Sequence, residues 1–217
     1  RTYLYRSLRA LDASLGGRLL IMRGDPAEVV PKVAKAVDAA TVHVAADFGP
    51  YGAERDDAVA KALAEDEREL VRTGSPYAVA PGRVRKDDGD PFKVFTPFRR
   101  AWAQHGWRKP ADTDADTLEW QQPSVKGAVQ IPDDEAVDAG LPDAGEDAAH
   151  ARWQAFLDGA LVDYAPGRDR PDKPGTSRMS VHLKYGEIHP RTMLADLARR
   201  RSESAEAYRT EIAWREF

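Results

Sequence analysis

Two short apolar runs, Thr41-Val-His-Val-Ala-Ala46 and Glu69-Leu-Val-Arg72, lie on either side of residues 53–66, which we predict to form a helix. Short runs of this kind, bounded by turn-forming residues, are typical of buried strands. Strands that alternate with helices of about 10–15 residues indicate a parallel sheet wrapped by helices. The sequence therefore predicts an α/β fold around these two runs.

The same alternation extends towards the N-terminus. Residues 3–15 have apolar positions at helical spacing, and Arg18-Leu-Leu-Ile-Met-Arg23 predicts a further buried strand. A helix is expected to follow to about Val37, with Asp25 as N-cap and Pro26 at its first position. We expect the first strand of such a domain to lie upstream of Arg1.

The remainder of the chain changes from α/β to helical character. Residues 73–94 are rich in Gly, Pro and Asp and predict a long loop, and Phe95 to His105 predicts a helix capped by Thr96. Downstream, we predict helical segments over about 147–159, 177–185, 190–201 and 203–217. The predicted organisation is an α/β domain over 1–107, an interdomain linker over 108–146, and an all-α domain over 147–217.

The composition limits the class of protein. The chain has 217 residues and a net charge of −4, so contact with nucleic acid requires a local basic patch. It has no cysteine, which fits a reducing cytoplasm and excludes disulfides and zinc–thiolate sites. No apolar run approaches the about 20 residues that span a bilayer. Since the chain begins at Arg1 and ends inside a predicted helix, we expect a piece of a longer protein.

The last third of the chain supplies the basic residues for such a patch, although solvated helix faces are an equally good explanation for any one of them. They are Arg168, Arg170, Lys173, Arg178, Lys184, Arg191, Arg199, Arg200, Arg201, Arg209 and Arg215. The five histidines show no spacing typical of a metal site, and we expect His43, in a predicted strand, to lie in the core.

Hydroxyl side chains are concentrated in Gly175-Thr-Ser-Arg-Met-Ser180, which follows the proline-broken loop from Tyr164 to Pro171. Ser and Thr at a helix start leave backbone N–H groups that attract an anion, and an Arg adds a charge-assisted hydrogen bond. Taken alone, this pattern fits simple helix capping better than a phosphate site.

Glu211, Trp214 and Arg215 form a second group, because residues three and four apart are neighbours on a helix. The alternative is an ordinary Glu–Arg ion pair beside a tryptophan of the core.

Together these two groups resemble the DNA photolyase/cryptochrome family, and most closely a class I cyclobutane pyrimidine dimer photolyase. The resemblance covers nearly the whole chain but only about half of such a protein. It implies a Rossmann-like antenna domain followed by an all-α FAD-binding domain that is cut short here. By this resemblance, the FAD-binding residues are Tyr164, Thr176, Ser177, Arg178, Met179 and Ser180. Met179 stands where Leu is common in the family.

The resemblance also implies a DNA site. Glu211 would hydrogen-bond a flipped-out pyrimidine dimer, and Trp214 would stack on it, which makes these two the catalytic residues. Arg168 would contact DNA phosphate, and Arg215 would face DNA and flavin from the same helix. Glu211 is typical of the cyclobutane branch, whereas the (6-4) branch and animal cryptochromes commonly have Gln there.

An antenna pigment, either a folate or a deazaflavin, is implied for the N-terminal domain. Asp88 and Asp90 fall where folate-binding members have polar and acidic contacts. A further candidate follows the predicted strand at 41–46 and consists of Asp47-Phe-Gly-Pro-Tyr-Gly52 with Arg55 and Asp56 after it. Open α/β sheets bind ligands at the carboxyl ends of their strands. The alternative is a strand-to-helix turn in which Arg55 and Asp56 make structural contacts.

The function implied by the resemblance is light-driven repair of cyclobutane dimers by electron transfer from reduced FAD. The expected partner is UV-damaged DNA, with no membrane association, no metal and a monomeric state, and we expect the piece alone to be inactive. Two alternatives stay open. They are a cryptochrome-type photoreceptor that signals to proteins, and an unrelated α/β protein with a helical tail.

Overall fold

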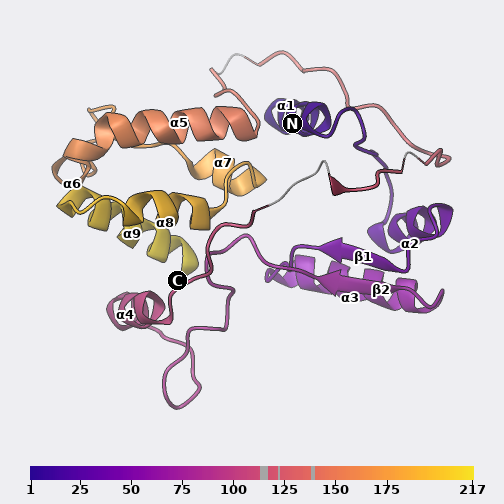
Figure 1. Ribbon diagram of the computed structural model, residues 1–217, viewed down its shortest axis with the longest axis horizontal. Helices are drawn as coiled ribbons and strands as arrows, with labels where there is room; N and C mark the ends of the chain where they lie inside the picture. The colour runs from indigo at the N-terminus through magenta and orange to yellow at the C-terminus, as the bar shows by residue number, and fades with distance from the viewer. Residues whose placement is uncertain (113–116, 122, 138–139) are drawn as a thin grey trace. The chain divides into compact units, whose positions relative to one another are not determined.

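The computed structural model describes residues 1–112, 117–121, 123–137 and 140–217, which Figure 1 traces. Their contacts form two compact units. The first comprises Arg1–Ser75 and the described part of Thr113–Val137, and the second comprises Pro76–Asp112 and the described part of Asp138–Phe217. The predicted order, a parallel α/β part followed by helices, is confirmed.

The first unit contains, in chain order, α1 (Thr2–Ser14), α2 (Pro26–Ala36), β1 (Thr41–Val44), α3 (Pro50–Ala64) and β2 (Glu69–Arg72). The two strands pair in parallel, with Thr41 opposite Glu69, and α3 supplies the crossover that a parallel pair requires. Helices α2 and α3 pack together around a small core of Ala34, Val59 and Leu63.

The start of α2 is as predicted, since the Asp25 carboxylate accepts a hydrogen bond from the Ala27 N–H and Pro26 is the first helical residue. The strand predicted over Arg18–Arg23 is wrong. Met22 makes an isolated antiparallel bridge with Ala128, so this run pairs with part of the predicted linker instead of joining β1 and β2. Periodicity detects a half-buried apolar run but does not identify its backbone partner.

Two further predictions about single residues are wrong. His43 is exposed on β1, and its ring lies 3.4 Å from the hydroxyls of Thr41 and Thr73 rather than in the core. Thr96 does not cap α4 (Phe95–His105), because it lies inside the helix, and the N-cap, Val94, makes no side-chain hydrogen bond.

The second unit is all-helical. In chain order it contains α4, α5 (Glu146–Asp158), the 3-10 helix η2 (Ala160–Asp163), α6 (Tyr164–Gly167), α7 (Ser180–Tyr185), α8 (Pro190–Ala198) and α9 (Glu203–Glu216). Helix α9 contacts α4, α6 and α8, and its buried residues Ala205, Tyr208 and Ile212 lie at helical spacing. The core around them includes Trp153 and Phe156 of α5.

Contacts place Pro76–Asp112 with the helices that follow it, although the sequence prediction assigned most of this segment to the first domain. The contact-defined units therefore differ from the predicted boundaries at residues 107 and 146, and those domain boundaries stay a prediction.

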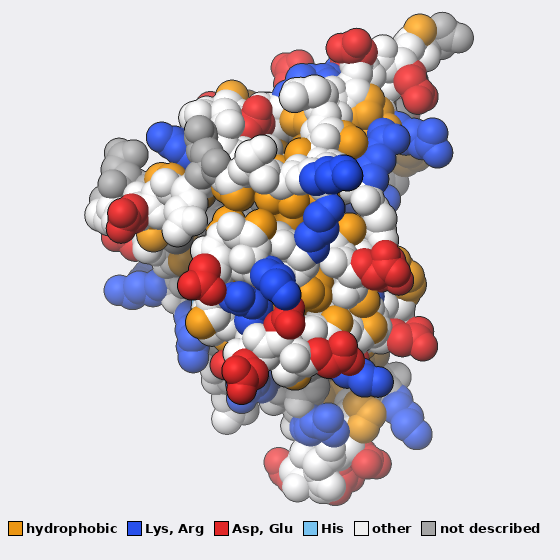
Figure 2. Space-filling view, turned by 90° about the vertical axis from the view of Figure 1, so that its right-hand side faces the viewer, with side chains coloured by type: hydrophobic (Ala, Val, Ile, Leu, Met, Phe, Trp, Pro, Cys, Tyr) orange, Lys and Arg blue, Asp and Glu red, His pale blue; other side chains and the backbone are white. Residues whose placement is uncertain are grey.

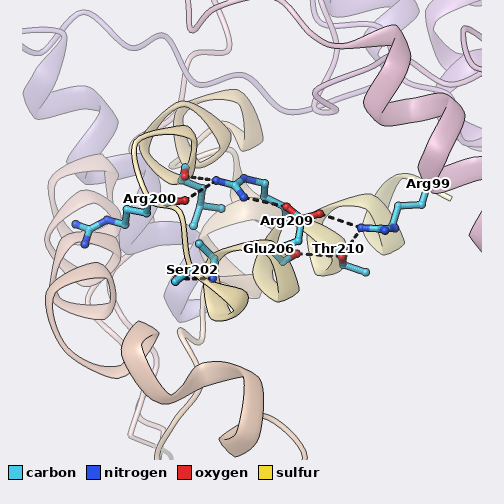
Figure 3. A network of polar contacts seen from close by, with 8 residues as sticks. Arg99, Arg200, Ser202, Glu206, Arg209 and Thr210 are labelled. Atoms are coloured by element: carbon cyan, nitrogen blue, oxygen red, sulfur yellow. Dashed lines mark hydrogen bonds and ion pairs between the residues drawn. The ribbon is translucent and has the colours of Figure 1, made fainter.

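Charged side chains fasten the neighbours of α9, as Figure 3 shows. Arg99 of α4 donates to the Glu206 carboxylate at 3.0 Å and to the Thr210 hydroxyl at 3.1 Å. Arg209 donates to the Leu197 carbonyl, which caps the last turn of α8, and to the Arg200 carbonyl just beyond the helix at 2.9 Å. Within the described ranges, no helix is long and apolar enough to cross a membrane.

Candidate functional site

A hollow of about 500 Å³ in the second unit gathers most of the residues singled out in the sequence. Its lining residues are Tyr164, Thr176, Ser177, Arg178, Met179, Ser180, Leu183, Tyr208, Glu211, Ile212 and Arg215. All six residues predicted for FAD line it, together with Glu211 and Arg215. Arg168 and Trp214 are not among the lining residues.

The loop before α7 forms one wall, but not by the predicted capping. Helix α7 begins only at Ser180, and its N-cap, Met179, makes no side-chain hydrogen bond. The buried hydroxyl of Ser177 instead lies 2.6 Å from the Tyr208 phenol oxygen. The first residue of α7 therefore has no hydroxyl cap, and the Ser177 hydroxyl accepts only a long, 3.4 Å hydrogen bond from the Met179 N–H before the helix, while its short contact fastens the loop to α9.

Arg178 has an unusual backbone at this wall. Its φ is +54°, in the left-handed region that costs a non-glycine residue roughly 1–2 kcal/mol. The side chain is exposed and makes no ion pair with a described residue. Thr176 and Ser180 are also exposed at the hollow. This wall thus offers a cation and two hydroxyls that are open to a ligand.

Aromatic rings form the inner side of the hollow. Tyr164 is buried, with its ring 5.6 Å from that of Phe156 and 5.1 Å from that of Tyr208. Burial raises the pKa of the Tyr164 phenol, and the charge of Glu211 raises it further. Burial likewise raises the pKa of Tyr208. Both phenols therefore stay protonated at neutral pH and can donate hydrogen bonds.

Tyr208 is a lining residue that the sequence analysis missed. It lies on α9 at helical spacing from Glu211, Ile212 and Arg215, all of which line the same hollow. Extending the predicted face of Glu211 back by one turn would have found it.

Glu211 is paired with Arg168 rather than with its helical neighbour Arg215. The Arg168 Nη1 atom lies 2.5 Å from Glu211 Oε1, and both side chains are about one-third exposed, at 33% and 37%. Arg215 donates to the Pro76 carbonyl at 3.0 Å, and its guanidinium lies 5.0 Å from the Tyr77 ring centre. Glu211 and Arg215 therefore have different polar partners, although both line the hollow.

Trp214 is half exposed, at 50%, and lies outside the hollow. Its indole stacks on Phe95 of α4, with ring centres 3.5 Å apart and planes inclined by 9°. The alternative of a core tryptophan beside an ion pair does not describe this residue.

The residues considered for an antenna lie elsewhere. Asp88 and Asp90 pair with Lys86 at 2.9 and 3.6 Å, and a hydrogen bond from the Asp90 N–H followed by one from Lys86 lowers the pKa of Asp88. Asp88, but not Asp90, lines a hollow of about 670 Å³ that also contains Arg83 and Phe92.

The turn after β1 shows both of the features that were weighed for it. Arg55 pairs with buried Asp56 at 2.6 Å, which is a structural contact, yet Arg55 also lines a hollow of about 470 Å³ with Tyr51. Gly52 packs on Asp47, where an added Cβ would lie 2.0 Å from the carboxylate.

On the face drawn in Figure 2, several Lys and Arg side chains lie side by side in the upper half, and Asp and Glu side chains are spread around and below them. Several of the basic residues noted in the last third have acidic partners. The pairs are Arg168–Glu211, Arg170–Asp172, Arg200–Asp158 and Arg209–Glu206.

Comparison with known proteins gives a consistent result. The family model described as DNA photolyase matches residues 1–117. A deoxyribodipyrimidine photo-lyase of Streptomyces griseus is 35% identical over 99% of this chain and 48% of its own length. One from Halobacterium salinarum is 34% identical over 97% of this chain and 47% of its own. The chain spans about half the length of these curated relatives.

Solved structures agree in fold. A bacterial class III photolyase from Agrobacterium tumefaciens superposes with a TM-score of 0.76 at 29% identity, over 100% of this chain and 48% of that one. A Synechocystis cryptochrome gives a TM-score of 0.82 at 22% identity, over 100% of this chain and 49% of that one, which is a likeness of fold alone. The assignment to class I therefore stays a prediction.

Proposed function

This chain belongs to the DNA photolyase family, and on that premise we propose that its full-length protein repairs cyclobutane pyrimidine dimers in DNA by means of light and reduced FAD. The observation that carries the proposal is the single hollow shared by Tyr164, the loop residues 176–180 and Glu211. It brings the residues proposed for the cofactor next to one proposed for the lesion.

The exposed wall of the hollow suits the phosphate and ribityl part of FAD. Arg178 supplies a cation without a competing acidic partner among the described residues, and Thr176 and Ser180 supply hydroxyls. Ser177 and Met179 are buried, so we propose that they hold the wall in place rather than contact the phosphates directly. The protonated Tyr164 phenol is a further donor. When bound, a reduced flavin supplies the electron that splits the dimer after light absorption.

Glu211 and Trp214 are the proposed lesion residues. An extruded base loses its stacking and pairing, which costs a few kcal/mol, and an aromatic face returns about 1–3 kcal/mol per base. The exposed indole of Trp214 lies one turn from Glu211 on α9, and the Glu211 carboxylate accepts hydrogen bonds from the bases. Arg168 and Arg215 serve DNA binding in this proposal, Arg168 by a contact to phosphate that positions the duplex.

An antenna pigment is also proposed, either a folate or a deazaflavin. Asp88 is better placed to contact it than Asp90, because only Asp88 lines the hollow beside α4. The hollow at Tyr51 and Arg55 is the alternative position.

The test is dimer cleavage under blue light by the full-length protein and by Glu211→Ala and Trp214→Ala variants. Glu203→Ala is the matched control, because Glu203 is an exposed acid in the first turn of the same helix. We expect strongly reduced repair in the first two variants and normal repair in the control, with equal FAD content in all.

Unchanged repair in both lesion-site variants would disprove the lesion assignment. A full-length protein that shows flavin absorbance but no dimer cleavage would favour the cryptochrome-type photoreceptor instead. Glu211 is the residue that favours repair, because the fold alone is shared by both kinds of protein.

A further inference from the structure

Phe95 is not part of the proposed cofactor or lesion site, yet it covers one face of the indole of Trp214. The ring centres are 3.5 Å apart and the planes differ by 9°, so the two rings overlap almost completely. A base cannot share that face of the indole. Trp214 nevertheless keeps 50% of its surface exposed to solvent.

The position of Phe95 is fixed independently of Trp214. It is the first residue of α4, which Arg99 fastens to Glu206 of α9 at 3.0 Å (Figure 3). One turn further along, the Trp102 indole N–H donates to the Glu216 carboxylate at 2.7 Å. Because α4 is held at these points, Phe95 presents a stationary surface to the indole.

An exposed tryptophan normally has several rotamers, and immobilising one side chain on binding costs about 0.5–1.5 kcal/mol. The stack on Phe95 restricts Trp214 before any ligand arrives. Phe217 adds an edge-on contact to both rings, with its centre 5.8 Å from Phe95 and 5.9 Å from Trp214. The open face of the indole is thereby held in one orientation.

We propose that Phe95 is a positioning residue for lesion binding, which keeps Trp214 oriented so that a flipped pyrimidine stacks on its free face. This inference rests on the proposed function, since it assumes that Trp214 receives the lesion. Phe95 itself touches neither the lesion nor the flavin and acts only through the indole.

The experiment measures the affinity of the full-length protein for an oligonucleotide with one thymine cyclobutane dimer and for the undamaged oligonucleotide. The variants are Phe95→Leu, Phe95→Tyr, Trp214→Ala and the double variant Phe95→Leu/Trp214→Ala. Phe98→Leu is the matched control, because Phe98 is a buried ring of the same helix that packs on Phe92 and Phe217 and not on Trp214.

We expect Phe95→Leu to weaken binding of the damaged oligonucleotide by about three- to tenfold. Binding of the undamaged one and the FAD content stay unchanged. Phe95→Tyr keeps the stack on Trp214, and we expect it to bind the damaged oligonucleotide as tightly as the wild type does. In the Trp214→Ala background Phe95→Leu has no further effect, because the ring it orients is gone. Phe98→Leu lowers the melting temperature but leaves the ratio of the two affinities as it is.

Two failures can be told apart. If Trp214→Ala does not change lesion affinity, the proposed lesion site is wrong and Phe95 has nothing to position. If Trp214→Ala weakens lesion binding while Phe95→Leu does not, or if Phe95→Leu retains its full effect in the Trp214→Ala background, the positioning role is overturned and the lesion site stands. If Phe95→Leu also lowers the FAD content, the Phe95→Tyr variant provides the test. A loss of lesion affinity in Phe95→Tyr as large as that in Trp214→Ala contradicts the positioning role.

Discussion

The carboxylate of Glu216 is expected to contribute strongly to the stability of the helical unit, through the donors it accepts. The Ala78 N–H and the Val79 N–H (3.0 Å) bond to its two oxygens, and the Trp102 indole N–H lies 2.7 Å from Oε2. These contacts join the loop at residues 76–79 and helix α4 to α9, across more than 100 positions of sequence.

The expected loss of stability follows from the number of N–H donors that are left without an acceptor. Burial raises the pKa of Glu216 although three N–H groups point at it, so the negative charge itself has no net advantage in the folded state. In Glu216→Gln the amide nitrogen replaces one oxygen and leaves one N–H without an acceptor, at a cost of about 1–3 kcal/mol. Glu216→Ala leaves all three donors without one, and we expect a loss of about 3 kcal/mol or more.

The assay is denaturant unfolding of the full-length protein, followed by tryptophan fluorescence, with Glu203→Gln as the exposed control on the same helix. Equal losses in the Gln and Ala variants would refute the acceptor argument. Losses below about 0.5 kcal/mol in both would show that water replaces the carboxylate without cost.

The raised pKa also predicts the sign of a pH effect. Above the ordinary value of 4.5, the folded state binds the Glu216 proton more tightly than the unfolded state does. This contribution to stability is therefore fully present below pH 4.5 and is lost as the pH rises through the higher folded pKa. The unfolding free energy of wild type minus that of Glu216→Gln should therefore fall as the pH rises through that window. An increase of this difference with pH would contradict the assignment.

Three shorter predictions concern the site. Arg168→Gln should lower the slope of log affinity against log salt by about 0.9, for damaged and undamaged DNA alike, and an unchanged slope excludes the phosphate contact. Tyr208→Phe removes the 2.6 Å hydrogen bond to Ser177 and should cost about 1 kcal/mol in thermal unfolding, with Ser177→Ala adding little to it. Arg178→Gly should raise the free energy of unfolding by about 1 kcal/mol through relief of the left-handed backbone, and it should make FAD release faster through loss of the cation. A variant that is less stable and also releases FAD faster would contradict a role of the side chain in FAD binding that is separate from folding.

Local patterns in the sequence were sufficient for most helices and for the parallel pair. β2 begins and ends as predicted, and the cap at Asp25 is present, because each depends on residues that are adjacent in the chain. The predicted strand at Arg18–Arg23 failed for the opposite reason. Its backbone partners lie near Ala128, and no local pattern encodes a partner at that distance.

Most of the residues that line the hollow were singled out from the sequence, but their contacts were not foreseen. Tyr164 and the 176–180 loop share a hollow with Glu211, as the family resemblance suggested. The bond from Ser177 to Tyr208 and the clamp of Glu216 on residues 76–79 were not foreseen. Both join side chains to distant segments, and such contacts depend on how the helices pack rather than on spacing within one helix.

The pairing of Glu211 with Arg168 is the most consequential of these contacts. Helical spacing suggested a partner four residues away, but the carboxylate contacts a guanidinium 43 residues away in sequence. Because both groups are about one-third exposed, solvent screens the pair and its contribution is at most about 1 kcal/mol. Under the proposed function, a DNA phosphate need only exceed this small energy to draw Arg168 away. The same exchange leaves the Glu211 oxygen free to accept a hydrogen bond from a base, so one step would prepare both contacts.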